Sequence, residues 1–401
     1  MMEISKRAHE MPQSAIRKLV PFAEAAKKRG VKVYHLNIGQ PDVDAPKEAM
    51  DAVKNIQLKQ VAYPHSAGIE SYRLGLAKFY QSLGMTDITH EDMIITTGGS
   101  EGVMLAFMVC LNPGDEVIVM EPFYTNYRGF ARWSDVVLKP VSSGKDMDFT
   151  LPPISEFEKA ITPKTKAILI CNPGNPTGYV YTQQELEALG ALVKKHNLFL
   201  FSDEVYRDFL YGGKPFFSCM DLKGLEENVV LLDSVSKRYS LCGVRIGALV
   251  SRNKAIIDSV LRFAQARLCC PALGQIAAEG ALAVSPEYFT IMRDEYKRRR
   301  DYMVNALNRM EGVYSPMPEG AFYTVAQLPV DDCDKFAQWL LESFEYEKQT
   351  LMLAPASGFY ATPGRGANEA RIAYVLNVPD LEKAMKCLEV ALKQYPGRTV
   401  K

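Results

Sequence analysis

Residues 229–251 decide how this 401-residue chain folds, and they read VVLLDSVSKRYSLCGVRIGALVS. The apolar runs Val229–Leu232 and Ile246–Ser251 are each typical of a strand buried on both faces of a sheet. Between them lie Ser234-Val-Ser-Lys237 and Arg245. A lysine becomes a nucleophile when desolvation or nearby positive charge lowers its pKa, and the end of a buried strand suits both conditions. Lys237 is therefore the first candidate for a reactive side chain.

Outward from this stretch, short apolar runs alternate with helical periodicity. The runs are Met93–Thr97, Glu116–Met120, Lys166–Cys171, Leu198–Ser202, Val229–Leu232 and Ile246–Ser251. Strands that alternate with helices are the signature of a mainly parallel sheet covered by helices on both faces. We therefore predict an α/β fold for this part of the chain.

Helices are expected both inside and outside this region. Thr182 and Glu185 have the spacing of a capping box at the start of a helix that runs to His196. The other expected helices are Ala15–Arg29, Pro46–Leu58, Ser71–Ser82 and Pro286–Arg309. We predict an N-terminal arm and lid segment (1–45) that packs with the small domain, a large ligand-binding domain (46–285) and a small α+β C-terminal domain (286–401).

Composition limits the class of partner. Lys plus Arg equals Asp plus Glu at 47 each, so no net charge attracts nucleic acid or an anionic membrane surface. No apolar stretch is long enough to span a bilayer, and residues 1–14 are charged and interrupted by proline where a signal peptide would be apolar. We therefore expect a cytoplasmic protein whose partners are small molecules.

Cysteine and histidine usage argues against a metal centre. The 8 cysteines contain no Cys-x-x-Cys pair, and Cys269 and Cys270 are adjacent, which suits reduced thiols. The 5 histidines are scattered singly. We predict no metal site.

In open α/β sheets, ligands bind beyond the carboxyl ends of the strands. Five of the predicted strands end in polar or aromatic residues, and these ends are GGSEG (98–102), EPFY (121–124), NPGNPTG (172–178), DEVY (203–206) and SVSK (234–237). Each is common alone as a helix start, turn or cap. Together they supply an anion cradle, a stacking ring, hydrogen bonds to a phenolate, a carboxylate for a pyridinium nitrogen and an amine for an aldehyde. That combination predicts a pyridoxal 5'-phosphate site.

The motif Asn-Pro-x-Asn-Pro-Thr-Gly, the Ser-x-Ser-Lys segment and an arginine eight residues after Lys237 form a specific set. With these motifs the chain resembles the class I and II aminotransferases of fold-type I, close to the bacterial aspartate and aromatic aminotransferases, from about Leu36 to Asn377. The resemblance implies a mainly parallel seven-stranded sheet in the large domain and a smaller α+β domain.

The resemblance also implies roles for the residues around the cofactor ring. Lys237 would form the covalent bond to the cofactor aldehyde, and Asp203 would keep the pyridine nitrogen protonated. Asn175 and Tyr206 would donate hydrogen bonds to the phenolic oxygen, and Tyr124 would stack on the ring. Lys237, Asp203 and Tyr206 are thus the expected catalytic residues.

The phosphate group and the subunit arrangement follow from the same resemblance. The expected phosphate ligands are the backbone around Ser100, Glu101 and Gly102, the side chains of Ser234 and Ser236, and Arg245. Tyr63, in the segment AYPHSAG, resembles a tyrosine that reaches the phosphate from the neighbouring subunit. The resemblance therefore implies a homodimer with shared active sites.

For the substrate, Arg371 resembles the arginine that grips the α-carboxylate, a task for which a planar guanidinium is suited. Asn175 and the backbone of Gly39 are expected beside it, with the Gly39 loop as a lid segment. Some relatives read a distal carboxylate with a lysine in the stretch that corresponds to 98–101, which holds none here. Our hypothesis is that Arg267 reaches across a dimer and contacts the substrate side chain, in particular its distal carboxylate. A structural role for Arg267 at the interface is the alternative.

These residues predict transamination by a ping-pong mechanism, with aspartate as the favoured donor and 2-oxoglutarate as acceptor. Aromatic or broad neutral donors are the alternative, and a β-eliminating C–S lyase could use the same site.

Ser234-Val-Ser-Lys237 also matches the Ser-x-x-Lys of serine acyl-transferring enzymes, but no Ser-Asp-Asn or Lys-Thr-Gly accompanies it. A ligand-sensing regulator would normally carry a DNA-binding segment, which the 35 residues before Leu36 leave no room for.

Overall fold

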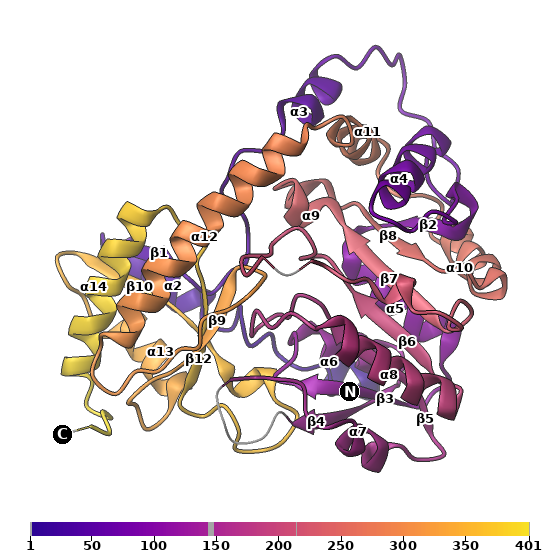
Figure 1. Cartoon of the computed structure of the whole chain (residues 1–401). Coiled ribbons are helices and arrows are strands. Elements are labelled where there is room, and N and C mark those ends of the chain that lie inside the picture. Colours follow the sequence, from indigo (N-terminus) through magenta and orange to yellow (C-terminus); the bar gives the residue numbers. More distant parts are fainter. Residues whose placement is uncertain (1, 143–147, 214, 401) are drawn as a thin grey trace.

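The computed structural model describes residues 2–142, 148–213 and 215–400. A seven-stranded sheet lies at its centre, with the strand order β2-β8-β7-β6-β5-β3-β4 (Figure 1). The strands are β2 (Met93–Thr96), β3 (Glu116–Glu121), β4 (Val137–Ser142), β5 (Thr165–Cys171), β6 (Phe199–Asp203), β7 (Val229–Ser234) and β8 (Gly247–Val250). Strand β8 runs antiparallel to the other six strands of this sheet, which all run in one direction. The predicted mainly parallel α/β sheet is confirmed.

Strand β4 was not expected from the sequence. Its residues, VLKPVS, include Lys139 and Pro140, and only Val141 is fully buried. The strand pairs with β3 alone, at the edge of the sheet, where a proline and a charge are tolerated. A search for buried apolar runs therefore passes over it.

Helices cover both faces of this sheet. Successive side chains of a strand point to opposite faces, and apolar side chains emerge on both. Ile168 and Ile170 of β5 pack with α4 and α8, whereas Ala167 and Leu169 pack with α5 and α10. The helices of this part are α3 (Lys47–Lys54), α4 (Glu70–Ser82), α5 (Gly98–Cys110), α6 (Asn126–Trp133), α7 (Ile154–Ala160), α8 (Gln183–His196), α9 (Val235–Arg238), α10 (Lys254–Ala266) and α11 (Ala272–Ala281).

The expected capping box of α8 is present. The amide of Glu185 donates to Thr182 Oγ1 at 3.2 Å, and the amide of Thr182 donates to Glu185 Oε2 at 2.7 Å. Two backbone N–H groups at the helix start, which have no partner within the helix, thereby form hydrogen bonds, as the sequence predicts.

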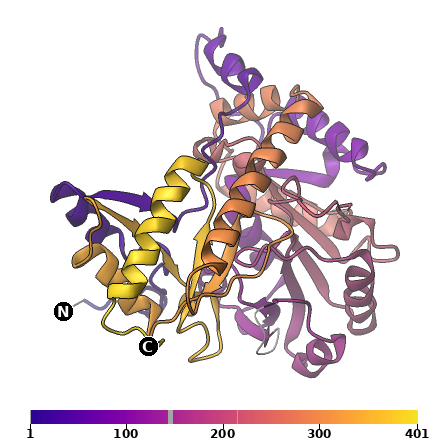
Figure 2. The ribbon, with the colours of Figure 1, turned by 60° about the vertical axis from the view of Figure 1, so that its left-hand side comes forward.

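A second group of elements brings the two ends of the chain together. Strand β1 (Lys32–His35) pairs in parallel with β10 (Gln349–Met352), and β11 (Ala354–Pro355), β12 (Glu369–Ala373) and β9 (Tyr323–Gln327) form an antiparallel sheet. Its helices are α2 (Val20–Lys28), α12 (Pro286–Asn308), α13 (Cys333–Glu342) and α14 (Val378–Gln394), whereas α1 (Lys6–His9) contacts the chain after α6 through Arg7 and Asp135. Helices α12 and α14 lie side by side (Figure 2). The division at residues 45 and 285 stays a prediction.

Helix α2 begins later than the expected Ala15–Arg29. Pro21 lies in its first turn, a position where proline is well tolerated because the missing N–H has no helical partner there. Residues 15–19 form a turn instead, and this turn proves important for the site.

The antiparallel direction of β8 gathers site residues at one edge. Gly247, the first residue of β8, lies opposite both Ser234 at the end of β7 and Thr96 at the end of β2. Arg245, which precedes β8, is therefore delivered to the edge where the six parallel strands end. No helix in the described part of the chain is both long and apolar enough to cross a membrane.

Candidate active site

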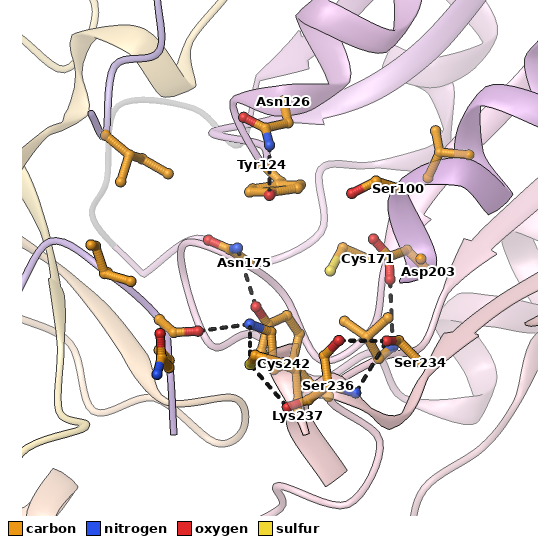
Figure 3. A pocket seen from close by; sticks show the side chains of 18 of the residues that line it. Ser100, Tyr124, Asn126, Cys171, Asn175, Asp203, Ser234, Ser236, Lys237 and Cys242 are labelled. Carbon is orange, nitrogen blue, oxygen red and sulfur yellow. Dashed lines mark hydrogen bonds between the residues drawn. The ribbon is translucent and has the colours of Figure 1, made fainter. Parts of the chain in front are cut away.

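A cavity of about 560 Å³ lies at the carboxyl ends of the parallel strands (Figure 3). Tyr124 and Asn126 lie on one side of it and Lys237 lies on the opposite side, with Asp203 between them. The predicted site residues on its wall are Gly39, Ser100, Tyr124, Asn175, Asp203, Tyr206, Ser234, Ser236, Lys237, Arg245 and Arg371. Residues from all five of the predicted strand ends thus meet in one place.

Asp203, the last residue of β6, is only 7% exposed. The Tyr127 hydroxyl donates a hydrogen bond to Asp203 Oδ2 at 2.6 Å. Burial raises the pKa of Asp203 to about 6, and the hydrogen bonds from Tyr127 and from the Val205 amide oppose that rise. A buried carboxylate of this kind is suited to a protonated ring nitrogen, whose positive charge would favour the ionised form.

Lys237 lies on the short helix α9, half-buried at the cavity wall. Its Nζ donates to the Gly39 carbonyl oxygen at 2.7 Å and lies 3.8 Å from Cys242 Sγ. Burial lowers the pKa of Lys237, and the positive charges of Arg371 and Arg245 lower it further, while Cys242 opposes them. The amine is therefore closer to its neutral, nucleophilic form than a solvated lysine is.

A buried ion-pair network supports α9 beneath Lys237. The next residue, Arg238, donates from Nε to Asp208 Oδ2 at 2.6 Å and from Nη2 to Asp233 Oδ2 at 3.0 Å. The Tyr80 hydroxyl donates to Asp233 at 2.9 Å. This network fixes the position of the reactive lysine, and the sequence did not point to it.

At the end of the cavity near β7, a set of donors surrounds a space suited to an anion. Ser234 Oγ accepts from the Ser236 amide at 3.1 Å and lies 2.8 Å from Ser236 Oγ. Gly98 opens α5 with a φ of +73°, and an added Cβ would overlap Arg245 Nη2. Glycine at this position therefore lets the guanidinium approach the helix start, where free N–H groups favour negative charge.

Glu101 and Gly102 do not line the cavity of the described chain. The Glu101 carboxylate accepts from the Thr97 amide at 2.5 Å and pairs with Arg267 Nε at 2.9 Å. Gly102 packs against Leu232, since an added Cβ would lie 3.2 Å from that side chain. Helix α5 reaches the cavity at Gly99 and Ser100 in its first turn and at Val103 one turn later.

Two further predicted residues lie off the cavity wall. Arg267 follows α10, forms an ion pair with Glu101 and donates from Nη2 to the Ile95 carbonyl at 3.0 Å. Tyr63 is 81% exposed in the connection between α3 and α4. The roles proposed for both depend on a second subunit and stay predictions.

At the opposite end, Arg371 of β12 is 1% exposed. Its Nη1 donates to Asn175 Oδ1 at 3.1 Å, and its Nη2 donates to the Asn37 carbonyl. Arg371 Nε is buried without a hydrogen-bond partner among the described residues. The guanidinium also lies 4.5 Å from the centre of the Tyr323 ring. An arginine held in this way has a donor left for a substrate carboxylate.

The sequence missed several residues of the wall. Tyr323 lies 2.9 Å from Tyr206 through their hydroxyl oxygens, and an added Cβ at Gly39 would overlap the Tyr323 hydroxyl. Tyr127 could have been found, because it lies in the first turn of α6, directly after the segment that contains Tyr124. Tyr323 carried no such signal, since 117 residues separate it from its partner. Cys171, Asn126 and Arg17 also line the cavity.

The residues present fit pyridoxal phosphate. The serines, Arg245 and the start of α5 would hold the phosphate, Asp203 the pyridine nitrogen, and Asn175 and Tyr206 the phenolic oxygen. Tyr206 already lies 3.4 Å from Asn175 Nδ2. Lys237 would hold the aldehyde carbon.

Comparisons with known proteins give the family. The model for the family described as aminotransferase class I and II matches residues 31–385. Aspartate aminotransferase from Thermotoga maritima is 33% identical, over 96% of this chain and 98% of that protein. Aromatic-amino-acid aminotransferase 2 from Thermococcus litoralis is 29% identical, over 98% and 99%. The solved structure of Thermus thermophilus aspartate aminotransferase with maleate matches with a TM-score of 0.88 and 29% identity, over 98% of this chain and 100% of that one. The chain therefore belongs to the class I and II aminotransferases and is a pyridoxal phosphate-dependent transaminase.

Proposed function

We propose that this transaminase moves the amino group of an L-amino acid, with aspartate favoured, to a 2-oxo acid such as 2-oxoglutarate by a ping-pong mechanism. The observation that carries the proposal is Arg371, a buried arginine with an unpartnered Nε on the same cavity as Lys237. Both half-reactions involve an α-carboxylate beside the reacting carbon. One cavity with one such arginine suits two substrates that bind in turn.

The side chains divide the work as follows. Bound pyridoxal phosphate supplies the ring that accepts electrons when the α-C–H bond breaks. Lys237 Nζ would accept the proton from the substrate α-carbon and hold it for the return transfer, a task that its lowered pKa favours. Asp203 holds negative charge against the ring nitrogen throughout. Arg371 fixes the α-carboxylate and so orients the hydrogen that is removed.

An absorption measurement tests this function. The visible band of the bound cofactor should disappear when L-aspartate is added and return when 2-oxoglutarate follows. Bleaching by aromatic or neutral amino acids alone would favour the broad-specificity alternative. A band that no amino acid changes would indicate a ligand sensor, and pyruvate with ammonia from β-substituted donors would indicate a C–S lyase.

Arg371→Ala is expected to lower kcat/KM for amino acids by about 10²-fold to 10³-fold, because the charge-assisted contact between the guanidinium and the α-carboxylate disappears. Arg371→Lys should recover part of the loss. A primary amine without a carboxylate serves as the control substrate and should react about equally well with all three enzymes. An equal loss for the amine would show that the substitution damages the site as a whole.

We also propose a homodimer that shares its active sites. Exposed apolar side chains on and beside the α3–α4 connection and near α11, namely Leu58, Val61, Leu268 and Leu273, suit a subunit interface. The α3–α4 connection projects from the molecule (Figure 1), as an arm that enters a partner's site would. The eight cysteines are free thiols, which agrees with the predicted cytoplasmic location.

Tyr63→Phe tests the shared site. The variant is expected to bind pyridoxal phosphate about tenfold more weakly, because one hydrogen bond to a charged phosphate is lost. Dissociation constants from cofactor fluorescence, together with the mass in solution from sedimentation, would measure both claims. A monomer of full activity, or an unchanged affinity in Tyr63→Phe, would contradict the proposal.

A further inference from the structure

The charged side chains on the cavity wall outnumber the roles assigned so far. Within the described residues they are Arg17, Asp203, Lys237, Arg245 and Arg371. A phosphate, a pyridinium nitrogen, an aldehyde and an α-carboxylate match four of them. Arg17 is the cation that has no assigned anion.

Arg17 lies in the turn that replaces the start of the expected helix. Its amide donates to the Ser14 carbonyl oxygen at 3.2 Å, and Ser14 and Ile16 line the same cavity. No carboxylate of the described chain forms an ion pair with its guanidinium. Burial raises the pKa of Tyr124, and the positive charges of Arg371, Arg17 and Arg245 oppose the rise, which places Arg17 within electrostatic reach of that ring.

Contacts on both sides hold the turn over the cavity. Before it, Arg7 pairs with Asp135 and Glu10 pairs with Arg132, at the end of α6. After it, Lys18 pairs with Asp334 of α13. The turn itself is fixed by Asn37, whose Nδ2 donates to the Ile16 carbonyl oxygen at 3.1 Å. Arg17 is thus anchored at the cavity rather than on a free terminal segment.

We propose that Arg17 binds the distal carboxylate of dicarboxylic substrates, both the amino acid donor and the 2-oxo acid acceptor. The proposal rests on the transaminase function proposed above. With the α-carboxylate on Arg371, a second carboxylate in the same cavity needs its own cation, and a guanidinium can meet both of its oxygens at once. Arg267, the earlier candidate, is paired with Glu101 and lies off the wall.

The exposed position of Arg17 gives the site a second property. Its side chain is solvent-accessible, so it can leave the cavity when a donor has an apolar side chain. Neutral donors then meet Ile16, Ile38 and Val205 on the wall instead of a buried, unpaired charge. One cavity can therefore accept a dicarboxylic acceptor and a neutral donor in successive half-reactions.

The test compares Arg17→Gln and Arg17→Lys with the unmodified holoenzyme. Calorimetry would measure the binding of succinate, an unreactive dicarboxylate, and of propionate, its monocarboxylate counterpart. Single-turnover rates would be measured with aspartate, glutamate, alanine and phenylalanine. In Arg17→Gln we expect succinate affinity and the rates with dicarboxylic donors to fall about tenfold to a hundredfold, and the values for propionate and neutral donors to change less than about threefold. Arg17→Lys should recover part of the loss.

Lys28→Ala is the matched control, because it removes an exposed cation from the same N-terminal segment away from the cavity. An equal effect of Arg17→Gln on both classes of ligand, or none on succinate, would overturn the proposal. A selective loss in Arg267→Ala instead would move the contact to that residue. If the unmodified enzyme reacts with no amino donor, the transaminase function fails, while the comparison of succinate with propionate still decides the role of Arg17.

Discussion

Lys237→Ala should lower kcat at least about 10⁴-fold, because in the proposed mechanism Lys237 supplies both the amine that binds the cofactor covalently and the base that moves the α-proton. The other cofactor contacts that we propose, from Asp203, Arg245, Ser234 and Tyr124, do not depend on that amine. The variant should therefore still bind pyridoxal phosphate, reversibly and with the spectrum of the free aldehyde.

Two comparisons make this result specific to proton transfer. Lys237→Arg keeps the positive charge but supplies no usable base, so it should be as inactive as the alanine variant. A small primary amine added to Lys237→Ala should restore part of the activity in proportion to its basicity. Full activity in either variant, or no rescue by any amine, would contradict the role of Lys237 as the base.

Asp203→Asn should have two opposite effects. In the holoenzyme we expect kcat to fall about 10²-fold to 10³-fold, because the variant lacks the charge that we propose keeps the ring nitrogen protonated. In the apoenzyme we expect greater stability at neutral pH. Burial holds the pKa of Asp203 at about 6, above its ordinary 3.8, so the ionised side chain costs the empty protein about 3 kcal/mol.

The pH dependence follows from the direction of that shift. Because the folded pKa is raised, the folded state binds more protons than the unfolded state between about pH 4 and pH 6, and the wild-type apoenzyme loses stability as pH rises through that window. Asp203→Asn lacks this loss. Urea unfolding of both apoenzymes at pH 4 and pH 8 would measure how the free energy of unfolding changes with pH in each. If the difference in the free energy of unfolding between the two apoenzymes is as large at pH 4 as at pH 8, the effect does not come from ionisation of Asp203.

The parts of the site that the sequence predicted are those in which chemistry and chain position coincide. Asp203, Asn175 and Lys237 each lie at or just after the end of a buried strand, so the topology alone brings them together. Glu101 belongs to the same kind of strand end, but its side chain turns back to cap α5 and to pair with Arg267.

Residues that reach the cavity only through tertiary folding have no local sequence pattern that marks them as site residues. Tyr323 reaches the cavity from a different sheet, and Arg17 reaches it because the N-terminal chain crosses from α6 to α13. Periodicity placed Arg17 inside a helix, where nothing would mark it as a site residue. Strand β4 was missed for the opposite reason, since an edge strand has no need of an apolar run.

The uneven distribution of charge in this molecule affects how ligands arrive and leave. The chain carries no net charge, yet among the described residues three arginines, one lysine and one aspartate line the cavity. Attraction of an anion is therefore weak at long range and concentrated at the mouth, within about one Debye length of 8–10 Å. A 2-oxo acid product carries the same carboxylates as the substrate, so it must break the same contacts to depart. We therefore expect product release, rather than the chemical step, to limit the rate of turnover with dicarboxylic substrates.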